Sequence, residues 1–196
     1  MKLTPRRTAI GLSVLALSLL TAAVALAAPI SGTNGPDNLT GTNGRDLIVA
    51  RGGNDTVDAR AGRDRVRAGK GNDTVHAGFG RDKVWAGEDD DTVDGGPGRD
   101  LIFAQRGVDT VNGGPGADNL WALARKDVTN EPSEPADTVN GGAGRDRIHV
   151  RDGEPDTVTC GDGYDVVRAD DEDSVATDCE RVKRRAPRSS DDNAEE

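Results

Sequence analysis

An aspartate recurs at every ninth residue from residue 37 to residue 118, and this spacing constrains the fold more than any other feature. The in-phase aspartates are Asp37, Asp46, Asp55, Asp64, Asp73, Asp82, Asp91, Asp100, Asp109 and Asp118. A glycine stands two residues before each of them except Asp91, which has Asp89 there, and an aliphatic residue stands two residues after each. The repeating unit is therefore a glycine turn, an aspartate and a very short strand.

One inward aliphatic residue in nine cannot form a hydrophobic core by itself. Side chains alternate between the two faces of a strand, so Val75 is expected to point inward and its neighbours Thr74 and His76 outward. Glycine allows the chain to reverse within a few residues. Parallel stacking of such units, about 4.8 Å apart, would line the aliphatic residues into a continuous thin core. The sequence therefore predicts an all-β parallel solenoid.

Alternate units differ, which reveals a second period twice as long as the first. Arginine precedes the aspartate in one set (Arg45, Arg63, Arg81 and Arg99), whereas threonine follows it in the other (Thr56, Thr74, Thr92 and Thr110). This pattern predicts a coil of two nonapeptide units, about 18 residues, with two chemically different sides.

Stacking would also place the aspartates in columns of like charge, which is unfavourable unless a cation neutralises them. Calcium takes 6 to 8 oxygen ligands, and carboxylates and the carbonyls of glycine turns both supply oxygen. We therefore expect calcium to bind here; the alternative is a solvated acidic face, which does not explain why glycine, aspartate and aliphatic residue keep a fixed phase.

The units "GGPGRDLIF", "RGGNDTVDA" and "GGAGRDRIH" resemble the nonapeptide G-G-x-G-x-D-x-U-x of the repeats-in-toxin, or hemolysin-type, calcium-binding family. The resemblance covers residues 32–129 closely and 137–168 more loosely. It implies a right-handed parallel β-roll with calcium between successive turns. The family's metal position maps onto the ten aspartates above and onto Asp137, Asp146, Asp156 and Asp165.

Two hypotheses stay open for the arginines beside these aspartates. Arg63, Arg81 and Arg99 would either pair with the carboxylates and lower calcium occupancy on their side, or project into solvent and only reduce the net charge.

The rest of the chain divides by composition. Lys2, Arg6 and Arg7 precede an uncharged apolar run that ends at an A-x-A cleavage signal, so residues 1–27 are expected to be a secretory signal peptide, with an uncleaved anchor as the alternative. Residues 28–129 are expected to form the regular roll. We expect a loop or bulge at 130–136, where prolines interrupt the pattern, degenerate repeats and a C-terminal cap at 137–182, and a disordered tail at 183–196.

Charge and cysteine content restrict the partners and the compartment. The chain has a formal net charge of -10, and removal of the signal peptide leaves 22 basic against 35 acidic residues. An acidic protein of this kind is not expected to bind nucleic acid. The only cysteines, Cys160 and Cys179, favour a disulfide that closes a short C-terminal loop in an exported protein. No transmembrane segment is expected after signal cleavage.

Three of the few aromatic residues, Trp85, Phe103 and Trp121, fall at one outward position on neighbouring coils. They are expected either to stack on one another or to form a contact patch for an extracellular glycan or protein.

No enzyme signature is present: His76 and His149 are far apart in sequence, and no H-E-x-x-H or G-x-S-x-G motif occurs. The sequence therefore predicts a secreted bacterial protein that binds calcium and folds on binding it, without enzymatic activity. The alternative is a calcium-stabilised adhesive module that uses the aromatic or the threonine column; polysaccharide lyase or epimerase activity is a third, weaker hypothesis.

Overall fold

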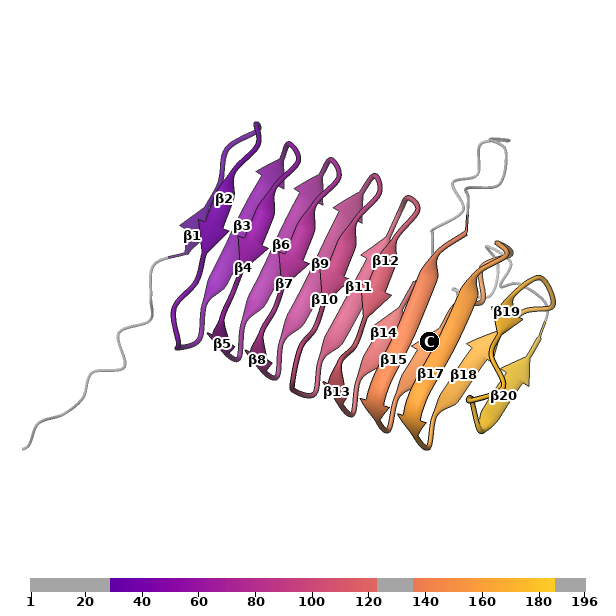
Figure 1. The fold of residues 1–196 in the computed structure, drawn as a ribbon. Helices are drawn as coiled ribbons and strands as arrows, with labels where there is room; N and C mark the ends of the chain where they lie inside the picture. The colour runs from indigo at the N-terminus through magenta and orange to yellow at the C-terminus, as the bar shows by residue number, and fades with distance from the viewer. Residues whose placement is uncertain (1–28, 123–135, 186–196) are drawn as a thin grey trace, which may run out of the picture.

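The computed structural model describes residues 29–122 and 136–185, which form a parallel β-solenoid (Figure 1). Successive coils stack side by side from the indigo end of the described chain to the yellow end. The fold predicted from the nine-residue repeat is thereby confirmed. The expected signal peptide, nearly all of the expected loop at 130–136 and most of the expected tail lie outside the described residues.

Two long parallel sheets form the walls of the solenoid. The first sheet contains, in spatial order, β1 (Ile30–Ser31), β3 (Leu47–Gly52), β6 (Arg65–Lys70), β9 (Lys83–Glu88), β11 (Leu101–Gln105), β14 (Asn119–Trp121), β16 (Arg147–His149), β18 (Val166–Ala169) and β20 (Arg181–Arg184). The second sheet contains β2 (Asn38–Thr40), β4 (Thr56–Asp58), β7 (Thr74–His76), β10 (Thr92–Asp94), β12 (Thr110–Asn112), β15 (Thr138–Gly144), β17 (Thr157–Gly163) and β19 (Ser174–Val175), and β13 (Pro115–Gly116) also pairs with β15. The short strands β5 (Ala61–Gly62) and β8 (Phe79–Gly80) pair at one turn.

The strand register confirms the expected coil length. Thr56 lies beside Thr74, so identical positions of the repeat meet, and the hydrogen-bonded aspartates just before them are 18 residues apart. The step widens to 28 residues between Asp109 and Asp137, because the chain between β14 and β15 is longer. At the next coil the step from Asp137 is 19 residues. The additional residue in this coil is therefore accommodated without a break, and the aspartate columns continue.

The core is a thin double row of aliphatic side chains between the two sheets. The residue two places after each aspartate is fully buried in the middle of the roll, as Ile48, Val66, Val93 and Ile102 illustrate. Small residues fill a second inward position: Ala50, Ala59, Ala68, Ala77, Ala86, Ala104, Ala122 and Ala169. Fully burying a valine or isoleucine side chain contributes about 1.5–3 kcal/mol, and here the contribution requires the neighbouring coils.

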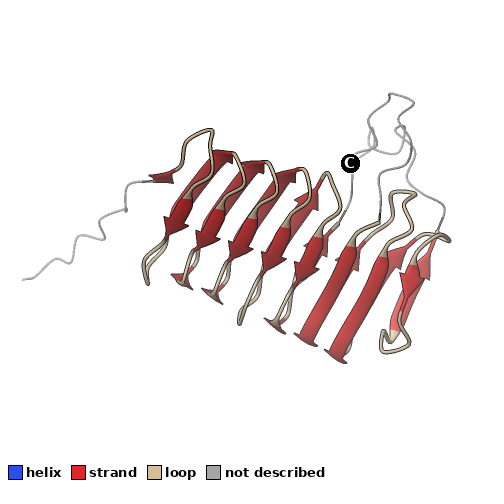
Figure 2. Ribbon diagram, turned by 45° about the horizontal axis from the view of Figure 1, so that its top comes forward, coloured by secondary structure: helices blue, strands red, loops and turns tan. Residues whose placement is uncertain are grey.

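The coils approach one another so closely at the turns that some positions require glycine. Gly87 has a φ of 138°, and an added Cβ would lie 1.9 Å from the carbonyl oxygen of Gly69 one coil earlier. The turns connect strands only, and no helix occurs in the described ribbon (Figure 2). Consequently, residues 29–122 and 136–185 hold no helix that could cross a membrane.

The C-terminal end differs slightly from the expected boundary. The tail was expected from residue 183, but β20 continues to Arg184 because Lys183 and Arg184 still pair with Arg168 and Ala169 of β18. At this end Val182 is 38% exposed, since β20 is the last strand of the described chain in this sheet.

Candidate metal centre

The predicted metal residues lie in two parallel columns inside the roll. One column precedes the strands of the first sheet: Asp46, Asp64, Asp82, Asp100, Asp118, Asp146 and Asp165. The other precedes the strands of the second sheet: Asp37, Asp55, Asp73, Asp91, Asp109, Asp137 and Asp156. Every one is buried except Asp37, which lies in the first coil and is partly exposed. The structure therefore brings the predicted residues together, but along two lines instead of in one pocket.

A hydrogen bond links each aspartate to the next one in its column. The backbone N–H of Asp73 donates to Oδ1 of Asp91 at 2.8 Å, and that of Asp64 donates to Oδ1 of Asp82 at 2.7 Å. The same bond recurs at 2.7 to 2.9 Å along both columns up to Asp156 and Asp165. One carboxylate oxygen per aspartate is thus committed to holding adjacent coils in register.

The second carboxylate oxygen has no hydrogen-bond partner at most of these positions. Buried Oδ2 atoms of this kind belong to Asp55, Asp64, Asp73, Asp82, Asp91, Asp100, Asp118, Asp146, Asp156 and Asp165. Burying an ionised carboxylate without a partner is strongly unfavourable, so buried charges are normally paired or coordinate a metal. The orphaned oxygens are therefore consistent with cation ligands.

Backbone carbonyl oxygens border the same space. A Cβ added to Gly95 would lie 3.2 Å from Oδ2 of Asp100 and 2.6 Å from the carbonyl oxygen of Gly113. At Gly113 the corresponding distances are 3.0 Å to Oδ2 of Asp118 and 2.5 Å to the carbonyl oxygen of Gly141. Carboxylate and carbonyl oxygens are the ligands that calcium prefers. The donor atoms at Asp100 and Asp118 in the first column therefore fit a hard divalent cation.

Burial and mutual repulsion raise the pKa of these carboxyl groups. Burial, reinforced by neighbouring carboxylates, raises the pKa of Asp91 to about 8 although the N–H of Asp73 opposes the shift. The same causes raise the pKa of Asp100 to about 7 and that of Asp156 to about 9. Near neutral pH, Asp91, Asp100 and Asp156 of the metal-free roll therefore retain protons to a greater extent than exposed aspartates do.

The arginines beside the first column form no ion pairs with it. Arg63, Arg81 and Arg99 are exposed. An ion pair of the described roll joins Lys70 to Glu88 on the surface and involves none of these arginines. Burial raises the pKa of Asp118 to about 7, and Arg99 opposes this shift only as a minor influence. The geometry agrees with the hypothesis that these arginines project into solvent.

The N-terminal ends of both columns are closed by threonine. The backbone N–H of Thr33 donates to Oδ2 of Asp37 at 2.6 Å, and that of Thr42 donates to Oδ2 of Asp46 at 2.7 Å. Both threonine hydroxyls also lie within hydrogen-bond distance of the same oxygens. In these first units the second carboxylate oxygen already has partners, in contrast with the interior units.

Sequence reasoning missed the acidic residues that close the C-terminal ends. Oδ1 of Asp173 accepts the N–H of Asp156, and Oε2 of Glu180 accepts that of Asp165 at 2.8 Å. These residues follow their column neighbours by 17 and 15 residues. The shortened step hid them, although an acidic residue near the expected position was a usable signal.

The predicted disulfide is present. Cys160 in β17 and Cys179 before β20 are joined, with their Cα atoms 5.2 Å apart. Asp178 lies beside the bond and accepts the N–H of Gly161 at 3.0 Å. Because the two sulfur atoms are bonded to each other, this cluster does not offer thiolate ligands to a metal.

The three predicted aromatic residues stack on the outer surface of the first sheet. Ring centroids are 5.9 Å apart between Trp85 and Phe103 and 6.0 Å apart between Phe103 and Trp121. The prediction did not include His149, which extends the column with its ring centroid 3.8 Å from that of Trp121. At the other end, the Arg67 guanidinium lies 5.5 Å from the centroid of the Trp85 ring. The expected mutual stacking is therefore observed.

Comparison with protein families identifies the repeat. A family model described as RTX calcium-binding nonapeptide repeat (4 copies) matches residues 31–66, 59–93, 67–102, 85–120 and 136–167. These matches together span more than half of the 196-residue chain. Comparisons with curated proteins and with solved structures found no match.

Proposed function

The chain belongs to the RTX calcium-binding nonapeptide repeat family, and we propose that it is an exported, non-enzymatic protein whose roll forms as calcium binds. Repeats of this family bind calcium, so the chain is a calcium-binding repeat protein. Export, folding coupled to calcium binding and the occupancy of individual sites are proposed in addition to calcium binding itself.

The observation that carries the proposal is the row of buried Oδ2 atoms without hydrogen-bond partners. In a metal-free roll, desolvation and like-charge repulsion oppose ionisation of the buried aspartates in each column. Calcium bound between coils would remove both penalties at once. A ligand that binds the folded state and not the unfolded state stabilises folding, and metal sites assembled only on folding couple the two processes.

Within each candidate site the chain's own groups have separate roles. Oδ1 of the aspartate accepts the N–H from the preceding coil and fixes the carboxylate, while Oδ2 faces the space beside a backbone carbonyl. Interior aspartates of both columns, such as Asp73, Asp91 and Asp100, are therefore the proposed ligands. Units in which threonine already satisfies Oδ2, at Asp37 and Asp46, are expected to bind more weakly.

Export to an oxidising, calcium-rich environment is proposed from the signal-like N-terminus and supported by the disulfide. The same features and the family support a bacterial, extracellular location.

The decisive experiment is circular dichroism of the purified protein as calcium is added and then chelated, with isothermal titration to count the bound ions. We expect an expanded chain in chelator, a β spectrum in calcium, and little response to magnesium. A complete β spectrum in excess chelator that calcium does not alter would disprove coupled folding.

A further inference from the structure

The outer face of the first sheet is basic, although the chain as a whole has a net negative charge. The aspartates of the columns are buried, so they contribute little to this face. We consider the two residues that flank the inward aliphatic residue of each first-sheet strand. Seven of them are exposed cations, Arg65, Arg67, Lys83, Arg147, Arg168, Arg181 and Lys183, and none is a carboxylate. Four more exposed arginines stand two residues before strands β3, β6, β9 and β11 of this sheet: Arg45, Arg63, Arg81 and Arg99. We call these residues the cationic face.

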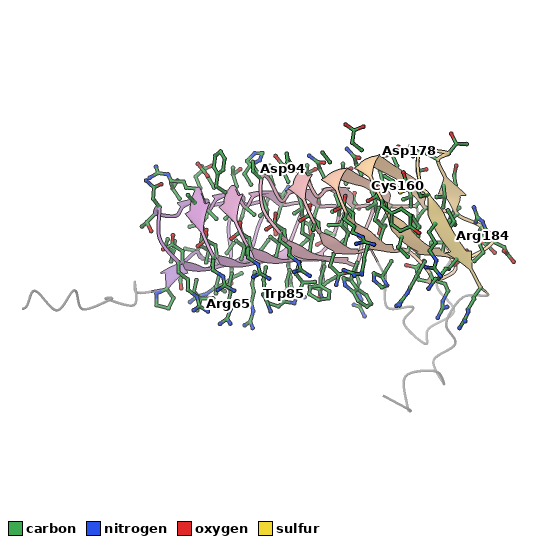
Figure 3. The ribbon with its side chains drawn as sticks, turned by 90° about the horizontal axis from the view of Figure 1, so that it is seen from below. Arg65, Trp85, Asp94, Cys160, Asp178 and Arg184 are labelled. Atoms are coloured by element: carbon green, nitrogen blue, oxygen red, sulfur yellow. A yellow bond between two sulfur atoms is a disulfide. The ribbon has the colours of Figure 1, made fainter. Side chains whose placement is uncertain are left out.

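The opposite sheet has the reverse character. Its flanking positions carry six threonines in register (Thr56, Thr74, Thr92, Thr110, Thr138 and Thr157), two aspartates and no lysine or arginine. Arg65 and Trp85 project from one side of the roll, whereas Asp94 projects from the other (Figure 3). Among the residues that flank the inward aliphatic positions, lysine and arginine are therefore confined to the first sheet.

The cations of this face form no ion pairs with other described residues. Arg65 lies beside Lys83 in the register, and Arg67 is directed over the Trp85 ring. Like charges directly opposite each other on adjacent strands are destabilising. An anionic partner would relieve this repulsion, so charge complementarity indicates what the face binds.

The aromatic column does not offer free ring faces to a ligand. Trp85 and Phe103 are nearly parallel, with 9° between their planes, and Trp121 is parallel to His149 within 3°. Because the rings cover one another, bases of a single-stranded nucleic acid have no platform for stacking. The column instead forms a rigid apolar strip beside the cations, and charge must provide the recognition.

The spacing of the cations favours one type of polyanion. Arg45, Arg63, Arg81 and Arg99 recur once per coil, which is about 4.8 Å in a parallel stack. One pyranose unit of an extended 1,4-linked polysaccharide advances by nearly the same distance and carries one carboxylate in a uronate chain. Phosphates of duplex DNA are about 3.4 Å apart along each strand and fall out of step with the coils.

We propose that the cationic face binds a linear acidic polysaccharide, with one acidic group per coil, at the outer surface of the first sheet. The inference goes beyond calcium binding, but it requires the roll to be folded. It gives the calcium-loaded protein a surface-binding role at acidic extracellular polymers.

The test is titration of the calcium-loaded protein with oligomannuronate, compared with a neutral mannose oligomer, an oligothymidylate and vesicles that contain anionic phospholipid. We expect binding of the oligomannuronate that weakens steeply with salt, and no binding of the neutral oligomer. Equal or tighter binding of the oligothymidylate or the vesicles would overturn the proposal, as would no binding of the oligomannuronate.

Two variants with the same change in net charge distinguish the effect of the cationic face on binding from the effect of net charge. The first replaces Arg63, Arg65, Arg81 and Lys83 with serine; the matched control replaces Thr56, Thr74, Thr92 and Thr110 with aspartate on the opposite sheet. We expect the first to weaken oligomannuronate binding by about tenfold or more and the second by less than about twofold. Equal losses would show that only net charge matters and would overturn the proposal.

Circular dichroism in calcium and in chelator is recorded for each variant. A variant that folds with calcium but no longer binds the oligomannuronate would show that binding requires the cationic face. Absence of calcium-dependent folding in the unsubstituted protein would instead contradict the proposed function. If a variant does not fold, the four-ligand comparison on the unsubstituted protein still decides the proposal.

Discussion

The backbone N–H of Asp73 donates a 2.8 Å hydrogen bond to Oδ1 of Asp91, one coil further along the roll, while Oδ2 of Asp91 is buried without a partner. The two oxygens of one carboxylate therefore have different roles: the first maintains the register and the second is available to a cation. This division explains why aspartate suits the position better than asparagine. Asparagine would retain the acceptor but not the charge.

Substitution of Asp91 separates these two roles. Asp91→Asn keeps an oxygen for the Asp73 N–H, so we expect reduced calcium stabilisation with a small effect in chelator near neutral pH. Asp91→Ala also leaves that N–H without an acceptor, which costs about 1–3 kcal/mol even without calcium. Thermal melting at a series of calcium concentrations measures both effects. Asp94→Asn on the outer surface is the control, and an equal loss of calcium response there would contradict the assignment.

Stability of the metal-free roll should decrease as the pH rises. Burial raises the pKa of Asp91 from its ordinary value of 3.8 to about 8, and that of Asp100 to about 7. Between the ordinary and the raised pKa the folded state binds more protons than the unfolded state, so the free energy of unfolding falls with rising pH. The contribution is complete below 3.8 and is lost as the pH passes through 6 to 9, where the raised pKa values of Asp64, Asp100, Asp91 and Asp156 lie.

Circular dichroism in chelator across this interval provides the measurement. We expect more β structure near pH 5 than near pH 9 without calcium, and a calcium affinity that increases with pH because ligand carboxylates must lose their protons. A chelated protein that is most stable at alkaline pH would contradict the role assigned to the buried columns.

The repeat alone predicted the coil length, the columns and the aromatic alignment, because identical positions of a fixed repeat must meet when coils stack. Spacing could not predict the N–H to Oδ1 ladder, since it does not reveal hydrogen-bond partners. Asp173 and Glu180 were missed because the step shortens at the end of the roll. His149 was missed because it pairs with Trp121 across the widened coil, where the regular spacing is lost. The basic face was also missed, because net charge does not distinguish buried from exposed carboxylates.

Glycine at the tightest turns should be difficult to replace. An added Cβ at Gly87 would lie 1.9 Å from the carbonyl oxygen of Gly69 in a backbone conformation with φ of 138°, whereas at Gly52 the nearest atom is 3.9 Å away. We expect Gly87→Ala to destabilise the calcium-loaded roll by about 1–3 kcal/mol, from strain at an unfavourable φ, and Gly52→Ala to have little effect. Chemical denaturation in calcium compares them. Equal losses would show that the closeness of the coils at Gly87 does not determine stability.

The disulfide should stabilise the C-terminal coils most. Cys160 and Cys179 are 19 residues apart, and closing a loop of this size contributes about 3 kcal/mol in the chain-entropy model. Because each coil contacts only its neighbours, a Cys160→Ser/Cys179→Ser variant should lose hydrogen-exchange protection in β17 to β20 before the central strands. Uniform loss across all strands would indicate that the roll unfolds as a single cooperative unit.

The stacked column of aromatic residues should contribute measurably to stability, apart from any ligand. Phe103 has aromatic neighbours on both sides, Trp85 and Trp121, and each stacked pair contributes about 0.5–1.5 kcal/mol beyond burial. Phe103→Leu preserves an apolar side chain but removes both pairs, so we expect a loss of about 1–3 kcal/mol, measured by chemical denaturation in calcium. Phe79→Leu is the matched control, since Phe79 is 66% exposed in β8 and belongs to no stacked pair among the described residues. If both variants lose the same stability, the ring geometry adds nothing beyond apolar contact. If Phe103→Leu weakens binding of the oligomannuronate without lowering stability, the aromatic column contributes to ligand binding and not to the stability of the sheet.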